Sequence, residues 1–171
     1  MNIALIGMRG SGKTTVAKLM ADKLNMKLIV TDELIEKRTG LKINQFVKEK
    51  GWQEFRRIEK EELLEIAEMD NLIIDTGGGI VENLDNQKLL KKISHIIWLK
   101  TDIEIIIKRL KDDAARPLLT KTNNLKQDLI NVNEKRKIIY KKLADYVIII
   151  DGKKPLTIAK EIIKLINNNN D

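Results

Sequence analysis

The segment Gly7–Thr14 constrains the fold of this chain more than any other part of the sequence. It reads Gly-Met-Arg-Gly-Ser-Gly-Lys-Thr and matches the phosphate-binding pattern G-x-x-x-x-G-K-[ST]. A short apolar run, Asn2–Ile6, precedes it, and an amphipathic pattern, Lys13–Leu24, follows it. The sequence therefore predicts a strand, a glycine-rich turn and a helix whose N-terminus faces a bound phosphate.

The rest of the chain continues this alternation of short apolar runs and longer amphipathic segments. The expected strands are Asn2–Ile6, Lys27–Val30, Leu72–Ile74, His95–Leu99 and Val147–Ile150. The expected helices are Lys13–Leu24, Gln53–Met69, Leu84–Lys91, Ile103–Leu110, Leu125–Leu143 and Leu156–Ile166. Near-continuous apolar strands separated by helices predict a three-layer α/β fold with a five-stranded parallel sheet covered on both faces.

A length of 171 residues suits one domain, 1–171, with two interruptions of the alternation. The expected core comprises residues 1–31, 60–111 and 125–166. Residues 32–59 hold extra helical patterns and are expected to form an acceptor-binding insert. The polar residues 112–124 are expected to form a mobile lid, because extra segments after the strands of an α/β sheet are where substrate is bound. Residues 167–171 are expected to form a disordered tail.

The composition excludes several classes of protein. The chain has no cysteine, so disulfides and thiolate metal sites are impossible. The net charge of +7 could indicate nucleic-acid binding, but most lysines sit singly or in pairs beside glutamates. Two Phe, two Tyr and two Trp are too few for the aromatic platforms of a single-strand binder. We expect an anionic small-molecule substrate and no nucleic-acid partner.

The first apolar run is far too short for a secretion signal or a membrane span. We therefore expect a cytoplasmic protein with no membrane partner. The small core and unbroken single domain suggest a monomer.

The glycine-rich loop predicts the residues that hold a nucleotide. Its glycines allow successive backbone N–H groups to turn toward the phosphates, and the helix N-terminus adds partial positive charge. Lys13 is expected to reach the β- and γ-phosphates, and the Thr14 hydroxyl to ligate Mg²⁺. The expected ATP-binding residues of the loop are Gly10, Ser11, Gly12, Lys13, Thr14 and Thr15. Switch GTPases, motor ATPases and small-molecule kinases share this loop, so it leaves the phosphate acceptor open.

Further motifs narrow the range of possible phosphate acceptors. They are Asp32 after the second apolar run, Gly51–Glu59, Asp75–Ile80, Ala115–Leu119 and Lys135-Arg136. With these motifs in the same order and at compatible spacing over essentially its whole length, the chain resembles the shikimate kinase family. The resemblance implies that the γ-phosphoryl group of ATP moves to the 3-hydroxyl of shikimate. The products would be shikimate 3-phosphate and ADP, in the pathway to chorismate and the aromatic amino acids.

The resemblance also implies roles on the acceptor side. Asp32 matches the aspartate that binds the acceptor hydroxyls and serves as candidate base. Arg56 and Arg136 match two arginines that clamp the shikimate carboxylate, and Glu59 matches the acid that orients Arg56. The glycines that would meet the substrate are Gly77, Gly78 and Gly79. A planar guanidinium binds a carboxylate through two parallel hydrogen bonds, which supports this assignment.

On the nucleotide side, Arg116 matches a lid arginine that closes over the transferring phosphate, and Arg109 matches an arginine that packs on adenine. The expected catalytic residues are Asp32, Lys13 and Arg116. From the residues alone, the alternative is that Asp32 merely caps the helix that follows it. Arg136 lies in a lysine-rich run that is typical of a solvated helix face.

Three more assignments concern side chains near these motifs. Arg57 is the neighbour of Arg56 on the same expected helix, so one of the two should be solvated. Trp52 is expected to be a packing residue, and Phe55 to pack or to wall the acceptor pocket.

The chain departs from the family pattern at the second strand. The family usually carries Asp-x-Asp there, but the first of the two positions is Val30. The absent aspartate normally helps to hold the magnesium ion. Asp75 ends the apolar run before Thr-Gly-Gly-Gly, where the family more often has a small residue. We hypothesise that Asp75 supplies the carboxylate that Val30 cannot, so that Thr14 and Asp75 are the metal-site residues.

Three other functions are the alternatives to this interpretation. Another small-metabolite kinase, of the gluconate or nucleoside-monophosphate type, would also use arginines to bind its acceptor. A regulatory GTPase is suggested by Asp75-Thr76-Gly77-Gly78, but no Asn-Lys-x-Asp guanine-binding motif occurs in the chain. A basic nucleic-acid-dependent ATPase would be stimulated by DNA or RNA and would depend steeply on salt.

Overall fold

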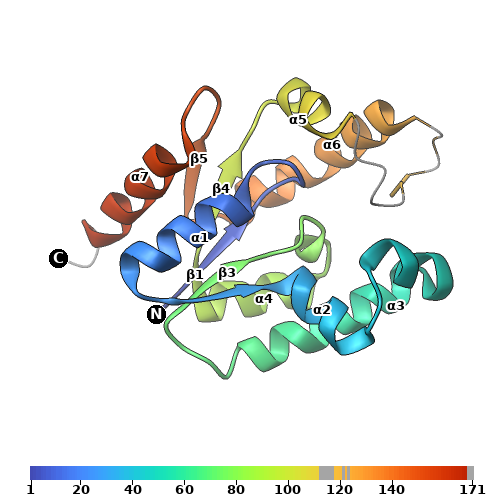
Figure 1. Cartoon of the computed structure of the whole chain (residues 1–171), viewed down its shortest axis with the longest axis horizontal. Helices are drawn as coiled ribbons and strands as arrows, with labels where there is room; N and C mark the ends of the chain where they lie inside the picture. The colour runs from blue at the N-terminus through green and yellow to red at the C-terminus, as the bar shows by residue number, and fades with distance from the viewer. Residues whose placement is uncertain (112–117, 121, 123, 169–171) are drawn as a thin grey trace.

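A parallel sheet forms the centre of the computed structural model, which describes residues 1–111, 118–120, 122 and 124–168 (Figure 1). Its strands are β1 (Asn2–Ile6), β2 (Lys27–Val30), β3 (Leu72–Asp75), β4 (Ser94–Lys100) and β5 (Tyr146–Ile149). The strand order is β2-β3-β1-β4-β5, and every neighbouring pair is parallel. The predicted five-stranded parallel sheet is confirmed. The third strand runs one residue further than expected, because Asp75 pairs with Leu5 of β1.

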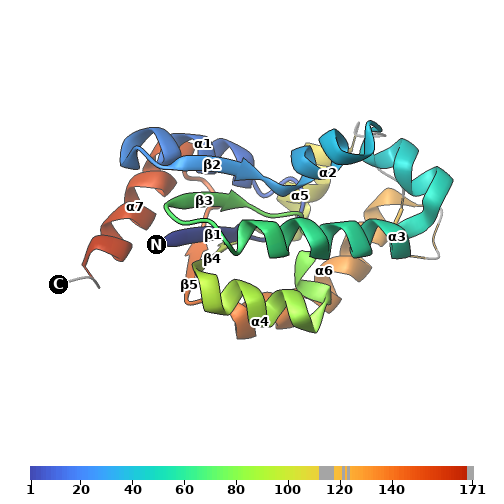
Figure 2. The same cartoon turned by 90° about the horizontal axis from the view of Figure 1, so that it is seen from below.

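Helices cover both faces of this sheet (Figure 2). They are α1 (Lys13–Leu24), α2 (Thr31–Thr39), α3 (Ile43–Ile66), α4 (Leu84–Ile93), α5 (Ile103–Leu110), α6 (Leu125–Leu143) and α7 (Pro155–Asn167), with a 3-10 turn η1 (Ile80–Glu82). Ile3 and Leu5 of β1 share a core cluster with α1 and α7, whereas Ala4 and Ile6 share another with α3, α4 and α6. Alternate side chains of a strand point to opposite faces, so a strand covered on both sides is apolar throughout.

The segment between β2 and β3 carries a small core of its own. Ile35 of α2 packs with apolar side chains of α3, including Phe46 and Phe55. Arg38 of α2 donates hydrogen bonds to Glu61 and Glu62 of α3. Apolar packing and ion pairs together therefore fix α2 against α3.

Two of the expected segment boundaries differ from the observed ends of helices. α2 begins at Thr31, directly after β2, so the helical segment starts one residue before the expected insert. Asn167, assigned to the tail from its composition, is the last residue of α7, because the helix continues until the Asn168 N–H bonds the Lys164 carbonyl. Residues 169–171 and most of the expected lid lie outside the described residues.

Among the helices that the structure describes, none is both long enough and apolar enough to cross a membrane.

Gly51 divides α3 into two helical stretches, which agrees with the separate helical patterns on either side of it in the sequence. Its backbone has φ 83° and ψ 167°, a conformation that is essentially restricted to glycine. A Cβ built on Gly51 would meet no atom of the described residues within 4 Å, so the restriction comes from the backbone and not from crowding. The break turns the chain just before Trp52, Phe55 and Arg56.

The substitution Gly51→Ala is expected to lower the free energy of unfolding by about 1–3 kcal/mol, because alanine adopts this backbone conformation only under strain. Urea denaturation checks this value. Lys50→Ala, at the exposed preceding position, is the matched control and should change stability by less than about 0.5 kcal/mol. Equal effects of the two substitutions would show that the positive φ at Gly51 carries no cost.

Candidate functional site

The Gly7–Thr14 loop connects β1 to α1, as its sequence pattern predicts. Lys13 is buried, and its ammonium donates hydrogen bonds to the carbonyls of Gly7 and Met8, each at 3.0 Å. Gly12 is the N-cap of α1, and no side chain in the described part of the chain caps this terminus. The loop therefore places a cation and the N–H groups of a helix N-terminus around one point, which is an arrangement suited to phosphate.

A cavity of about 320 Å³ opens over this loop. Five of the six residues expected to bind nucleotide line it: Gly10, Gly12, Lys13, Thr14 and Thr15. Ser11, the sixth, is fully buried within the loop. Arg109, on the last turn of α5, donates a hydrogen bond of 2.9 Å to the Gly10 carbonyl, so its side chain lies against the loop. Its contact with adenine stays a prediction, and Arg116 lies outside the described residues.

Thr14 and Asp75 meet at the edge of this cavity. The Thr14 hydroxyl donates a hydrogen bond of 2.5 Å to Asp75 Oδ2, and Asp75 is only 4% exposed. Burial raises the pKa of Asp75, against the opposing effects of the Lys13 ammonium and this hydrogen bond. Asp75 of β3 is also the direct neighbour of Val30 across the β2–β3 pair. The carboxylate thus occupies the strand position adjacent to the one where the family pattern expects an aspartate.

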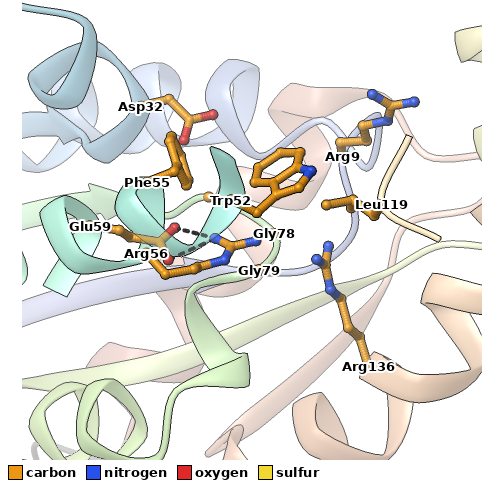
Figure 3. Close-up of a pocket in the computed structure, with 11 residues that line it drawn as sticks. Arg9, Asp32, Trp52, Phe55, Arg56, Glu59, Gly78, Gly79, Leu119 and Arg136 are labelled. Atoms are coloured by element: carbon orange, nitrogen blue, oxygen red, sulfur yellow. Dashed lines mark hydrogen bonds and ion pairs between the residues drawn. The ribbon is translucent and has the colours of Figure 1, made fainter. Parts of the chain in front are cut away.

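A second, narrower cavity adjoins the first (Figure 3). Its lining comes from α2, α3, the glycine triplet after β3, α6 and Leu119. Arg9, Asp32, Gly77 and Gly78 line both cavities. A group bound in the second cavity would therefore lie next to a phosphate bound in the first.

Arg56 enters the second cavity from α3. Its Nη1 donates to both carboxylate oxygens of Glu59, at 2.9 and 2.7 Å, and its guanidinium lies 5.4 and 5.3 Å from the ring centroids of Trp52 and Phe55. Arg57 instead is exposed and forms ion pairs with other glutamates on the solvent side of α3. Arg56 is therefore the cavity-facing member of the pair.

Arg136 enters the same cavity from α6. It is only 4% exposed, and its Nε donates a hydrogen bond of 2.9 Å to Glu82. The lysine-rich run around it suggested a solvated helix face, and for Arg136 that alternative is wrong. The helix directs the Arg136 side chain toward η1, where Glu82 is its acidic partner.

The glycine triplet is packed too tightly for side chains. A Cβ on Gly77 would lie 2.9 Å from Asp32 Oδ1 and 3.1 Å from Glu59 Oε1. A Cβ on Gly79 would lie 2.0 Å from Arg56 Nη2 and 2.8 Å from Arg136 Nη2. The absence of side chains in the triplet lets Arg56 and Arg136 reach the same point.

Asp32 faces this triplet from the first turn of α2. Val30 occupies the N-cap position, and among the described residues no side chain caps the helix through a hydrogen bond. The alternative that Asp32 is merely the cap of α2 is therefore not supported. The negative charge of its carboxylate helps to raise the pKa of Glu59.

Several residues of the site escaped the sequence motifs. Arg9 lies inside the glycine-rich loop at a position where the motif permits any residue, and Trp52 both packs on Phe55 and lines the cavity. Tyr140, one turn beyond Arg136, donates a hydrogen bond of 2.6 Å to the Gly78 carbonyl and so holds the glycine triplet in place. Glu82 had no sequence signal, because its role depends on a helix more than fifty residues away.

Glu59 makes the stability of the protein depend on pH. Burial, and to a smaller extent the Asp32 carboxylate, raise the pKa of Glu59 to about 7, despite the attraction of Arg56. The pKa of this carboxyl is higher in the folded protein than in the unfolded chain, where it is near 4.5. Such a group stabilises the folded protein at a pH below the unfolded pKa, and this contribution is lost as the pH rises to about 7.

We expect Glu59→Gln to flatten the pH dependence of unfolding between about pH 4.5 and 7. Over this window the wild type should lose on the order of 3 kcal/mol relative to the variant. Chemical denaturation across the window measures both proteins. Glu54→Gln, an exposed glutamate of the same helix, is the control and should keep the wild-type slope. An unchanged slope in Glu59→Gln would contradict the prediction.

Comparison with known proteins agrees with this geometry. The family model described as shikimate kinase matches residues 9–167. A shikimate kinase of Sulfurihydrogenibium is 40% identical over 162 residues, which are 95% of each chain.

Two solved structures extend the agreement to three dimensions. A shikimate kinase from Acinetobacter baumannii in complex with shikimate is 32% identical, with a TM-score of 0.93 over 98% of this chain and 93% of that one. The enzyme from Aquifex aeolicus is 35% identical, with a TM-score of 0.86 over 99% and 98% of the two chains. The fold, the phosphate loop and these relatives together show that the chain belongs to the shikimate kinase family of ATP-dependent phosphotransferases.

Proposed function

We propose that this protein transfers the γ-phosphoryl group of ATP to the 3-hydroxyl of shikimate, giving shikimate 3-phosphate and ADP in aromatic amino acid biosynthesis. The observation that carries the proposal is the convergence of Arg56 and Arg136 on Gly79, beside the cavity of the phosphate loop. Two guanidinium groups from separate helices suit a carboxylate and also fix its orientation.

The acceptor side would work mainly by positioning. Arg56 and Arg136 would hold the shikimate carboxylate at one end of the smaller cavity. Asp32, which lines both cavities, would accept a hydrogen bond from the acceptor hydroxyl. As the hydroxyl oxygen bonds to the γ-phosphorus, the bond from phosphorus to the oxygen of ADP breaks, and Asp32 takes the hydroxyl proton late in the transfer.

The nucleotide side would supply charge neutralisation. Lys13 and the N–H groups of the loop would stabilise the phosphate oxygens, whose charge is distributed around the transferring group. The predicted roles of Arg109 at adenine and Arg116 over the γ-phosphate, and of residues 112–124 as a lid, belong to the same proposal. Closing the site would exclude water, which would otherwise compete with the acceptor.

We also propose that Thr14 and Asp75 hold the magnesium ion that accompanies ATP. Both present oxygen atoms at the edge of the nucleotide cavity, the donor type that Mg²⁺ prefers. Across the described residues no three His, Cys, Asp or Glu side chains gather as a metal site. This fits an ion that takes one or two protein ligands and otherwise phosphates and water. When bound, Mg²⁺ would neutralise phosphate charge during the transfer.

The proposal further includes a monomer with residues 32–59 as the acceptor-binding insert. Both cavities are formed by residues of a single chain, so no second copy is needed to complete them.

The acceptor can be tested by measuring ADP release from ATP with shikimate, gluconate and nucleoside monophosphates offered separately. We expect shikimate alone to stimulate release, because it combines a carboxylate with the hydroxyl that the site would hold. Stimulation by gluconate or a nucleotide without stimulation by shikimate would leave only a small-metabolite kinase of another specificity.

The magnesium assignment predicts that Asp75→Asn raises the Mg²⁺ concentration for half-maximal rate by at least roughly tenfold. Asp85→Asn, an exposed aspartate of α4, is the control and should not change it. Because Val30 and Asp75 are register partners, the added change Val30→Asp should restore part of the lost Mg²⁺ affinity in the Asp75→Asn protein. An unchanged magnesium requirement and turnover in Asp75→Asn would sink the assignment.

A further inference from the structure

The two clamp arginines are held in similar ways. Arg56 is paired with the buried Glu59, and Arg136 is paired with Glu82, the last residue of η1. Glu82 is 27% exposed, whereas the Arg136 side chain is almost completely buried. Since η1 directly follows the glycine triplet, Glu82 is attached to the same stretch of backbone that the acceptor would contact.

The hydrogen bond from Arg136 Nε determines which part of the guanidinium faces the cavity. A guanidinium can bind a carboxylate in a bidentate manner through an edge that includes Nε or through the edge formed by Nη1 and Nη2. Glu82 occupies Nε at 2.9 Å. Nη1 lies toward Gly78 and Nη2 toward Gly79, at 3.4 and 2.8 Å from the Cβ positions of these glycines. The edge formed by the two terminal nitrogens is thus the one directed at the triplet (Figure 3).

The two arginines also need an anionic partner where they meet. The Nη2 atoms of Arg56 and Arg136 both lie within 3 Å of one Cβ position, so two like charges approach each other. Partial burial opposes ionisation of Glu82, but Arg136, Lys135 and Arg56 together lower its pKa below the usual range. Glu82 is therefore an anion at neutral pH and offsets the repulsion between the arginines.

Lys135 is the other cation near Glu82, but it contributes much less. Its Nζ lies 3.8 Å from Glu82 Oε1, and its side chain is 69% exposed. An exposed ion pair at this distance is screened by solvent.

We propose that Glu82 is a positioning residue for acceptor binding: it fixes Arg136 so that Nη1 and Nη2 face the acceptor carboxylate. The inference rests on the proposed function, because it takes the carboxylate of shikimate as the ligand of Arg136. Glu82 lines neither of the two cavities, so the proposal adds a residue outside them to the determinants of acceptor affinity.

Glu82→Gln keeps the shape of the side chain and removes its charge. We expect it to raise the KM for shikimate, and the Kd measured by calorimetry, by roughly tenfold, because the neutral amide oxygen accepts the Arg136 Nε–H only in a weaker hydrogen bond without the charge. The KM for ATP and kcat should stay within about twofold, since Glu82 does not line the nucleotide cavity. Glu82→Asp, which restores the carboxylate, should recover part of the affinity. Lys135→Ala is the matched control and should leave the KM for shikimate near the wild-type value.

A double-mutant cycle tests whether Glu82 acts through Arg136. In an Arg136→Ala protein, adding Glu82→Gln should cause no further loss of shikimate affinity. An additional loss of the same size, or parallel losses for shikimate and ATP with a lowered Tm, would show a general structural role and overturn the inference.

The two proposals fail in distinguishable ways. A wild-type protein that releases no ADP in response to shikimate would overturn the proposed function and this inference with it. An active wild-type protein whose shikimate KM is unchanged by Glu82→Gln would overturn the inference alone.

Discussion

The parallel pairing of β1 with β3 is the constraint on which the site depends. Leu5 is paired with Asp75, so the two strands end at the same edge of the sheet. The glycine-rich loop leaves β1 there, and the glycine triplet follows β3. The two turns come so close that a Cβ on Gly78 would lie 3.1 Å from the Gly7 carbonyl. One strand pair thus creates the common boundary of the nucleotide and acceptor cavities, where a phosphoryl group would cross.

Around that boundary the protein concentrates positive charge and compensates it locally. Arg56 and Arg136 each keep a carboxylate partner, Glu59 in one case and Glu82 in the other. A buried guanidinium without a partner would be costly, and two close together would also repel each other. The partners allow the arginines to be in place before an acceptor arrives, so less order has to be imposed on binding. The raised pKa of Glu59 shows that burial of such a partner has its own cost.

The β2–β3 pair carries the feature that separates this chain from the family pattern. Val30 and Asp75 are direct neighbours across the two strands. A carboxylate can therefore be absent from one strand and present on the other while still facing nearly the same space. The Thr14 hydroxyl, bonded to Asp75, lies on the nucleotide side of this pair. This geometry supports the proposed magnesium site. The missing aspartate at Val30 and the additional aspartate at Asp75 are far apart in the sequence, and it is the strand register that makes them neighbours.

The sequence by itself determined the strands, most helices and the phosphate loop, because these follow from local periodicity and from a motif of eight adjacent residues. Family resemblance selected Arg56 over Arg57. Only the tertiary structure decided that Arg136 is buried and that Glu82 and Tyr140 support the site. These contacts join residues 54 and 62 positions apart, and each depends on how α6 is rotated against η1 and the glycine triplet. Such a rotation is set by the packing of the whole core, and a local pattern along one helix cannot specify it.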